Sequence, residues 1–176
     1  MRQRNASALF NQEHAANYDD RFAKLASMRD APHLLMRALL SELSAEARIL
    51  CVGAGTGSEL INLAQGFPTW HFTAVEPSSP TLDICRRRTE DLGLASCCVF
   101  YEGYLNSLAA SDPSDAATSL LVSQFCIWTE DRRGFFHQIA MRLRPDAYLV
   151  SVDLASDMSS ATYLSFRNLA ATVQVL

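Results

Sequence analysis

The sequence is poor in lysine and has no extended basic segment, which argues against a nucleic-acid partner. Lys24 is the single lysine among 15 basic residues, the formal net charge is −4, and the one basic run is Arg86-Arg87-Arg88. Proteins that bind along a nucleic-acid backbone usually present a basic face, because phosphate contacts supply most of the affinity. The composition therefore makes nucleic acid an unlikely partner, and leaves room only for a small patch against a tRNA loop.

Long apolar runs are also missing. No run approaches the roughly 20 residues that a membrane-spanning helix needs. The two arginines that follow Met1 are not succeeded by the apolar segment of a secretory signal. Hydrophobic residues make up 49% of the chain and charged residues 19%, a balance typical of a folded globular protein. We expect a cytoplasmic protein without membrane contact.

Metal-binding and disulfide patterns are missing as well. The five cysteines are odd in number and include no Cys-x-x-Cys pair, and the four histidines show no ligand-like spacing. Four of the cysteines lie in apolar stretches, where a thiol behaves as a small hydrophobic side chain. We therefore expect neither a disulfide framework nor a metal site.

What the sequence does contain is an alternation of short apolar runs and amphipathic stretches. The expected strands are Arg48–Val52, Trp70–Val75, Cys97–Tyr101, Asp115–Ser123 and Ala147–Asp153. Three helices are expected between them. The first covers residues 58–66, and the second is capped by Ser79 and ends at Gly93. The third is capped by Thr129 and ends at Arg144-Pro145. Strands that alternate with helices indicate right-handed βαβ units, hence a doubly wound α/β fold with a mainly parallel sheet.

The chain divides at residue 46. Residues 47–176 carry the alternating pattern, whereas residues 1–46 contain helical patterns only and are expected to form a lid. Within this lid Pro32 is expected to start a helix. The side chains expected on its buried side are Leu34, Leu35, Ala38, Leu39 and Leu43.

The turn Gly53-Ala54-Gly55-Thr56-Gly57 lies between an expected strand and an expected helix, a context in which a glycine-rich loop indicates nucleotide binding. Gly53 permits the sharp turn out of the strand, and Gly55 and Gly57 let a ligand approach the backbone. Glu76 ends the next strand, where a carboxylate can accept both hydroxyls of a ribose. The plain alternatives are a tight turn without a ligand and a surface acid.

The region around these residues resembles the class I S-adenosylmethionine-dependent methyltransferases of the small-molecule type. Ile49–Gly57 is similar to their first motif, and Val75–Leu82 is similar to their second, acidic motif. Weaker similarities cover Asp115–Ser123, Leu143–Leu149 and the element Asn17-Tyr18-Asp19. The G-x-G-x-G spacing matches this family, whereas Ser58 stands where a dinucleotide motif needs Gly or Ala.

The resemblance implies the cofactor S-adenosylmethionine and methyl transfer to a small-molecule acceptor. It assigns the glycine loop to the methionine side, Glu76 to the ribose and Pro77 to the adenine edge, with Tyr18 closing over the site. The residues implied in cofactor binding are Gly53, Ala54, Gly55, Gly57, Glu76, Pro77, Ser123, Gln124 and Tyr18. No catalytic residue and no particular acceptor follow from it. A tRNA-modifying enzyme and an inactive, binding-only chain remain as alternatives.

The chain departs from the family pattern at several positions. Cys51 stands where an acid is common, Gly103-Tyr104 where a Gly-Asp pair is common, and Asp146-Ala147 where Gly-Gly is usual. The terminal β-hairpin of the family is not visible, so the core is expected to be truncated at its C-terminus. An apolar fifth strand would then form an open edge, and we expect a homo-oligomer that pairs through it.

Overall fold

The computed structural model describes residues 26–126 and 128–153. The helices are α3 (Ala26–Leu40), α4 (Ser58–Gly66), α5 (Ser79–Asp91) and α6 (Thr129–Ala140), with short 3-10 turns η1 (Ala95–Cys97), η2 (Leu105–Ser107) and η3 (Ser123–Phe125). The strands are β1 (Arg48–Val52), β2 (His71–Glu76), β3 (Cys98–Glu102), β4 (Ser114–Leu120) and β5 (Leu143–Val152).

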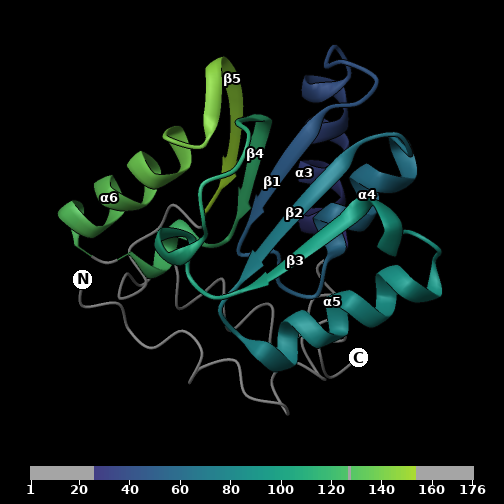
Figure 1. The fold of residues 1–176 in the computed structure, drawn as a ribbon, viewed down its shortest axis with the longest axis horizontal. Helices are drawn as coiled ribbons and strands as arrows, with labels where there is room; N and C mark the ends of the chain where they lie inside the picture. The colour runs from purple at the N-terminus through teal and green to yellow at the C-terminus, as the bar shows by residue number, and fades with distance from the viewer. Residues whose placement is uncertain (1–25, 127, 154–176) are drawn as a thin grey trace.

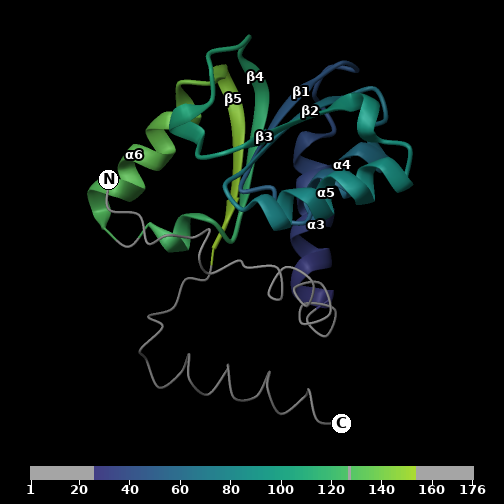
Figure 2. The same cartoon turned by 60° about the horizontal axis from the view of Figure 1, so that its bottom comes forward.

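The five strands form one sheet in the order β3-β2-β1-β4-β5, and every pairing is parallel. Helices cover both faces, with α3, α4 and α5 on one side and α6 on the other (Figures 1 and 2). This arrangement confirms the doubly wound α/β fold. The strand order reverses between β1 and β4, so the connections leave β1 and β4 on opposite faces and open a crevice at their carboxyl ends.

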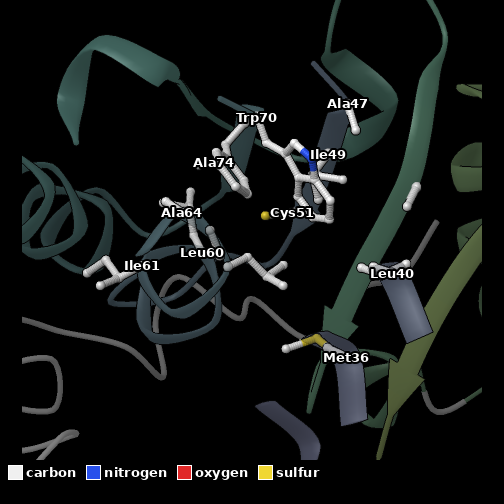
Figure 3. Close-up of a cluster of buried hydrophobic side chains, with 14 residues drawn as sticks. Met36, Leu40, Ala47, Ile49, Cys51, Leu60, Ile61, Ala64, Trp70 and Ala74 are labelled. Carbon is white, nitrogen blue, oxygen red and sulfur yellow. The ribbon is translucent and has the colours of Figure 1, made fainter. Parts of the chain in front are cut away.

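Side chains that alternate along β1 supply two separate cores. Ile49 and Cys51 pack toward α3 and α4, whereas Leu50 and Val52 pack toward α6. Figure 3 shows the first of these cores, with the indole of Trp70 next to Ile49. The indole Nε1 of Trp70 donates to the carbonyl oxygen of Ser44 at 3.0 Å, so this buried ring keeps its polar atom satisfied.

The buried face of α3 differs from the one predicted. Leu34, Leu35 and Leu39 are 70%, 61% and 56% exposed, whereas Met36 and Leu40 are fully buried. Helical periodicity allows several overlapping apolar stripes in a leucine-rich segment, and the contact with α4 and the sheet selects one of them. The prediction that Pro32 starts this helix is also wrong, since the helix begins at Ala26 and contains Pro32.

Several element ends also differ from the prediction. Ser78, not Ser79, caps α5, and its Oγ accepts from the backbone N–H of Thr81 at 3.4 Å. Helix α6 ends at Ala140, before the Arg144-Pro145 pair that was expected to end it, and that pair lies inside β5. The register of β4 and β5 shifts between Ser114 and Ala116, and Asp146 has a φ of 62°. This bulge extends the strand beyond the stretch that periodicity identifies.

Strand β5 pairs only with β4 within the described part of the chain. Its apolar side chains are incompletely covered, with Tyr148 53% exposed and Leu149 37% exposed. Strands of parallel sheets are normally covered on both faces, so the exposure of these side chains on β5 is unusual.

Among the described residues, no helix is long and apolar enough to cross a membrane.

Candidate functional site

The turn between β1 and α4 is held against the neighbouring strand by backbone bonds. The N–H groups of Gly53 and Ala54 both donate to the carbonyl oxygen of Val75, at 2.8 and 3.1 Å. Gly53, Gly55 and Gly57 have φ values of 71°, 57° and 85°, in the left-handed region where a side chain costs energy. The glycine pattern in the sequence is therefore explained first by backbone conformation.

The space around the three glycines differs. A Cβ on Gly57 would lie 2.5 Å from Sγ of Cys85 on α5, and a Cβ on Gly53 would meet the side chain of Val122. A Cβ on Gly55 would have only the carbonyl oxygen of Gly53 near it, at 3.9 Å. Gly57 is thus required for the packing of α5 against the turn, and its assignment to cofactor binding stays a prediction. Gly55 is the glycine whose Cβ side is open.

Glu76, at the end of β2, is bound to the same turn. Its Oε2 accepts from the N–H of Gly55 at 3.1 Å, and its Oε1 accepts from the N–H of Ser78 at 2.9 Å. Burial raises the pKa of this carboxyl, and the two N–H bonds act in the opposite direction. An ionised carboxylate offers about four lone-pair sites, so acceptor capacity remains for hydroxyl groups of a ligand.

A cavity opens beside this turn, at the carboxyl ends of β1, β2 and β3. Its wall is formed by Val52, Gly53, Val75, Pro77, Gly103, Tyr104, Leu105, Asn106, Val122, Phe125, Cys126, Phe135 and Gln138. Among these described residues no side chain is charged. A mostly apolar wall with a few neutral polar groups suits a flat aromatic ring.

The predicted site residues Ser123 and Gln124 lie next to this cavity, between Val122 and Phe125, but are not part of its wall. The Oγ of Ser123 donates to Oδ2 of Asp153 at 2.6 Å and accepts from Nη2 of Arg132 at 2.7 Å. The N–H of Gln124 donates to Oδ1 of Asp153 at 3.1 Å. Asp153 therefore connects the end of β5 to the loop after β4 and to α6.

Asp153 and Arg132 were not recognised in the sequence. The signal that identifies Glu76, an acid at the end of a strand, applies equally to Asp153, because carboxyl ends of parallel strands meet at one edge. Arg132 carries no such signal, since an arginine in the first turns of an amphipathic helix is usually solvated.

A second buried carboxyl lies on the opposite side of the glycine turn. Glu59, in the first turn of α4, is 6% exposed, and its Oε1 accepts from Oγ1 of Thr118 on β4 at 2.8 Å. Burial raises the pKa of Glu59 to about 8, the hydrogen bond from Thr118 opposes this, and the charge of Glu76 adds to it. Burial likewise raises the pKa of the Cys51 thiol.

Two further expectations from the sequence concern Tyr18 and metal binding. Tyr18 lies outside the described residues, so its assignment stays a prediction. Within residues 26–126 and 128–153, no group of three or more His, Cys, Asp or Glu side chains is placed to hold a metal ion.

Comparison with known proteins gives one family. Residues 49–146 match the model of a family described as a methyltransferase domain, and they include the glycine turn, Glu76 and the cavity wall. No curated protein matches the sequence.

The fold is similar to many solved structures. The mitomycin 7-O-methyltransferase is 25% identical with a TM-score of 0.58, over 72% of this chain and 37% of that one. S-adenosylmethionine-dependent methyltransferases from Thiobacillus denitrificans and Geobacter sulfurreducens, both solved with S-adenosyl-L-homocysteine, are 24% and 21% identical. Each has a TM-score of 0.58 over 69% of this chain and 47% of that one. The chain therefore spans less than half the length of these proteins.

Proposed function

The chain belongs to the methyltransferase domain family, and from this premise we propose that it binds S-adenosylmethionine and transfers the methyl group to a small-molecule acceptor. The cofactor would lie across the carboxyl ends of β1, β2 and β3. The glycine turn, with Gly53, Ala54, Gly55 and Gly57, would face its methionine side, and Glu76 would hold its ribose. The cavity that begins at Pro77 would take the adenine ring.

One observation carries this proposal: the Glu76 carboxylate is fixed beside the open glycine. Both of its oxygens are positioned by backbone N–H groups, those of Gly55 and Ser78. A carboxylate that is already oriented pays little further entropy when it accepts two vicinal hydroxyls. Vicinal hydroxyls are the feature of a ribose, and the adjacent uncharged cavity is suited to the attached base.

When bound, S-adenosylmethionine supplies a methyl group already activated by its sulfonium. The protein's task is then mainly to align an acceptor and exclude water, so no dedicated base is required. We assign Ser123 and Gln124 to the edge of the site nearest the methyl group or the acceptor. Their loop is held by Asp153 and Arg132, which would keep this edge in place. Tyr18 is proposed to close over the site.

The acceptor class rests on charge and on similarity. The net charge is −4, without an extended basic segment that could track a nucleic acid. The mitomycin 7-O-methyltransferase, whose fold this chain shares, is named for a small-molecule acceptor. These two points favour a small molecule over tRNA.

The test is calorimetric titration of S-adenosylmethionine, S-adenosylhomocysteine and NAD into the protein and into Glu76→Gln. We expect both adenosyl ligands to bind and the substitution to weaken them at least about tenfold, because hydrogen bonds to a charged group are lost. Glu102→Gln is the matched control, since Glu102 stands opposite Glu76 in the register of β2 and β3 but is exposed.

The outcomes separate the remaining alternatives. Binding of NAD with no binding of either adenosyl ligand would indicate an oxidoreductase instead. If none of the three ligands bound, the proposed cofactor site would be overturned, and the chain would be an inactive member of the fold that serves only in assembly. Equal weakening by Glu76→Gln and Glu102→Gln would show that charge alone, rather than the ribose contact, explains the loss.

We also propose that a second copy of the chain covers the edge of β5. The support is the exposure of Tyr148 and Leu149 on a strand that pairs with β4 alone among the described strands. An exposed apolar edge strand favours association. Sedimentation of the protein and of Tyr148→Lys tests this, since a dimer that uses this edge is expected to dissociate when the lysine is introduced.

A further inference from the structure

Two of the five cysteines lie side by side where η1 meets β3. Cys97 is the last residue of η1, and Cys98 is the first residue of β3. Their Sγ atoms are 3.9 Å apart, and both thiols donate to the carbonyl oxygen of Leu94, at 3.1 and 3.3 Å. Neighbouring side chains along a strand point to opposite faces, so a strand alone would separate these sulfurs. The change from a 3-10 turn to a strand brings them together.

The pair differs from the other cysteines in its exposure. Cys97 and Cys98 are half-buried, whereas Cys51, Cys85 and Cys126 are buried. The pair lies at the amino end of β3, and the cavity lies at the other end of this strand, where Gly103 follows it. A reagent in the solvent therefore reaches the pair without entering the proposed cofactor site.

The two thiols differ in how readily they lose a proton. Burial, followed by the neighbouring Cys97 thiol, raises the pKa of Cys98 to about 12, so Cys98 keeps its proton at neutral pH. The thiolate is the form of cysteine that acts as a nucleophile. Cys97 is therefore the sulfur expected to react first, with the Cys98 thiol held next to it.

We propose that Cys97 and Cys98 form an oxidation site, which hydrogen peroxide converts reversibly into a disulfide between adjacent residues. The Cys97 sulfur attacks one peroxide oxygen, the O–O bond breaks, and a sulfenic acid and water form. The Cys98 sulfur then attacks the Cys97 sulfur, and the S–O bond breaks. The hydroxide leaves with the Cys98 proton as a second water. The pair loses two electrons, and the peroxide gains them.

The expected disulfide is suited to a reversible modification rather than to a structural cross-link. A disulfide stabilises mainly by closing a loop in the unfolded chain, and adjacent residues close almost none. Adjacent Cα atoms are about 3.8 Å apart, below the range of about 4.4–6.8 Å that is usual for a disulfide, so the bond is strained. Strained disulfides are the ones that are readily reduced.

The experiment treats the reduced protein with hydrogen peroxide, alkylates the remaining thiols in urea and digests the product with a protease specific for glutamate. Cleavage after Glu90 and Glu102 gives the peptide 91–102, whose only cysteines are Cys97 and Cys98. Mass spectrometry is expected to show this peptide without alkyl groups and lighter by two hydrogen atoms than its reduced form. Dithiothreitol added before alkylation is expected to restore both thiols.

Three variants test the order in which the thiols react. Cys126→Ser is the matched control, since Cys126 is buried in the cavity wall, and it is expected to keep the disulfide. Cys98→Ser is expected to stop at the Cys97 sulfenic acid, which dimedone traps as an adduct. Cys97→Ser leaves only the thiol that keeps its proton, so dimedone labelling is expected to be at least about tenfold lower. Circular dichroism of each variant checks that it is folded.

Other products would overturn this inference. Recovery of the peptide 91–102 with both cysteines alkylated would show that peroxide does not oxidise the pair. A cross-link to the preceding peptide, which contains Cys85, would assign the disulfide to different thiols. Thiols that dithiothreitol does not restore would show irreversible oxidation, and equal dimedone labelling of Cys97→Ser and Cys98→Ser would contradict the order. None of these results depends on cofactor binding, so the proposed function is tested separately.

Discussion

The glycine turn has two sides that differ in what they contact. On the outer side, Gly55 faces open space and its N–H is bound by the Glu76 carboxylate. On the inner side, Gly57 packs against Cys85 of α5, and the Glu59 carboxyl is buried against Thr118. Gly55 and Gly57 share a left-handed conformation and differ in the reason that a side chain is excluded.

The difference teaches that a glycine pattern combines two requirements. One is the close packing of a helix on a strand, which contributes to stability whether or not a ligand binds. The other is access to the backbone, which matters only for a ligand. Substitutions on the inner side should therefore lower stability, and substitutions on the outer side should lower affinity.

The largest effect is expected for Gly57→Ala. The new Cβ would combine a left-handed φ with a 2.5 Å approach to the Cys85 sulfur, so we expect the free energy of unfolding to fall by ~2–4 kcal/mol. Urea denaturation measures this. Adding Cys85→Ala removes the sulfur and should restore part of the loss. Equal stabilities of Gly57→Ala with and without Cys85→Ala, after correction for Cys85→Ala alone, would contradict the packing explanation.

Gly55→Ala is expected to affect ligand affinity more than stability. Nothing but the carbonyl oxygen of Gly53 lies near the new Cβ, so the stability cost is limited to the conformational penalty of ~1–2 kcal/mol. Affinity for S-adenosylhomocysteine is expected to fall at least about tenfold, because the methyl group occupies the space proposed for the ligand. Calorimetry together with urea denaturation checks both parts. Unchanged affinity would place the ligand elsewhere.

At pH 5 the smallest effect is expected for Glu59→Gln, and this effect grows as the pH rises. The pKa of Glu59 is raised from 4.5 to about 8, so the folded state holds a proton that the unfolded state releases. This proton contributes stability at low pH that is lost as the pH rises from 4.5 to about 8. Glutamine is always neutral and can still accept from Thr118.

We therefore expect Glu59→Gln to melt near the wild-type temperature at pH 5 and above it at pH 8. Differential scanning calorimetry at the two pH values measures this change. The same gain at both pH values would show that Glu59 is not protonated in the folded protein. Glu102→Gln, on an exposed carboxylate, is the control and should shift the melting temperature equally at both pH values.

The features that could be predicted from the sequence are those that depend on neighbouring residues. The glycine turn, Glu76 and the alternation of strands and helices depend on residues close in sequence, so their spacing was sufficient. The strand order agrees with the doubly wound fold because right-handed crossovers leave few arrangements open. Element ends were less well predicted, since Ser78 and Ser79 are equally suitable caps and a bulge lengthens β5.

Contacts between distant segments account for what was missed. Glu59 and Thr118 are 59 residues apart, and Ser123 and Asp153 are 30 apart, so no local pattern connects either pair. The buried face of α3 was also missed because it depends on distant contacts. The stripe of Leu34, Leu35 and Leu39 is as apolar as the face that the helix buries, so the sequence alone does not distinguish them.

The amino-acid order thus specified the backbone conformation of the turn, the acid at the end of β2 and the type of fold, because these follow from local sterics and periodicity. The assembled chain specified which glycine packs and which stays open, which helix face is buried, and which carboxyl keeps its proton. Those properties depend on the atoms that folding brings within a few ångströms of each side chain, and these atoms come from elements far apart in the sequence.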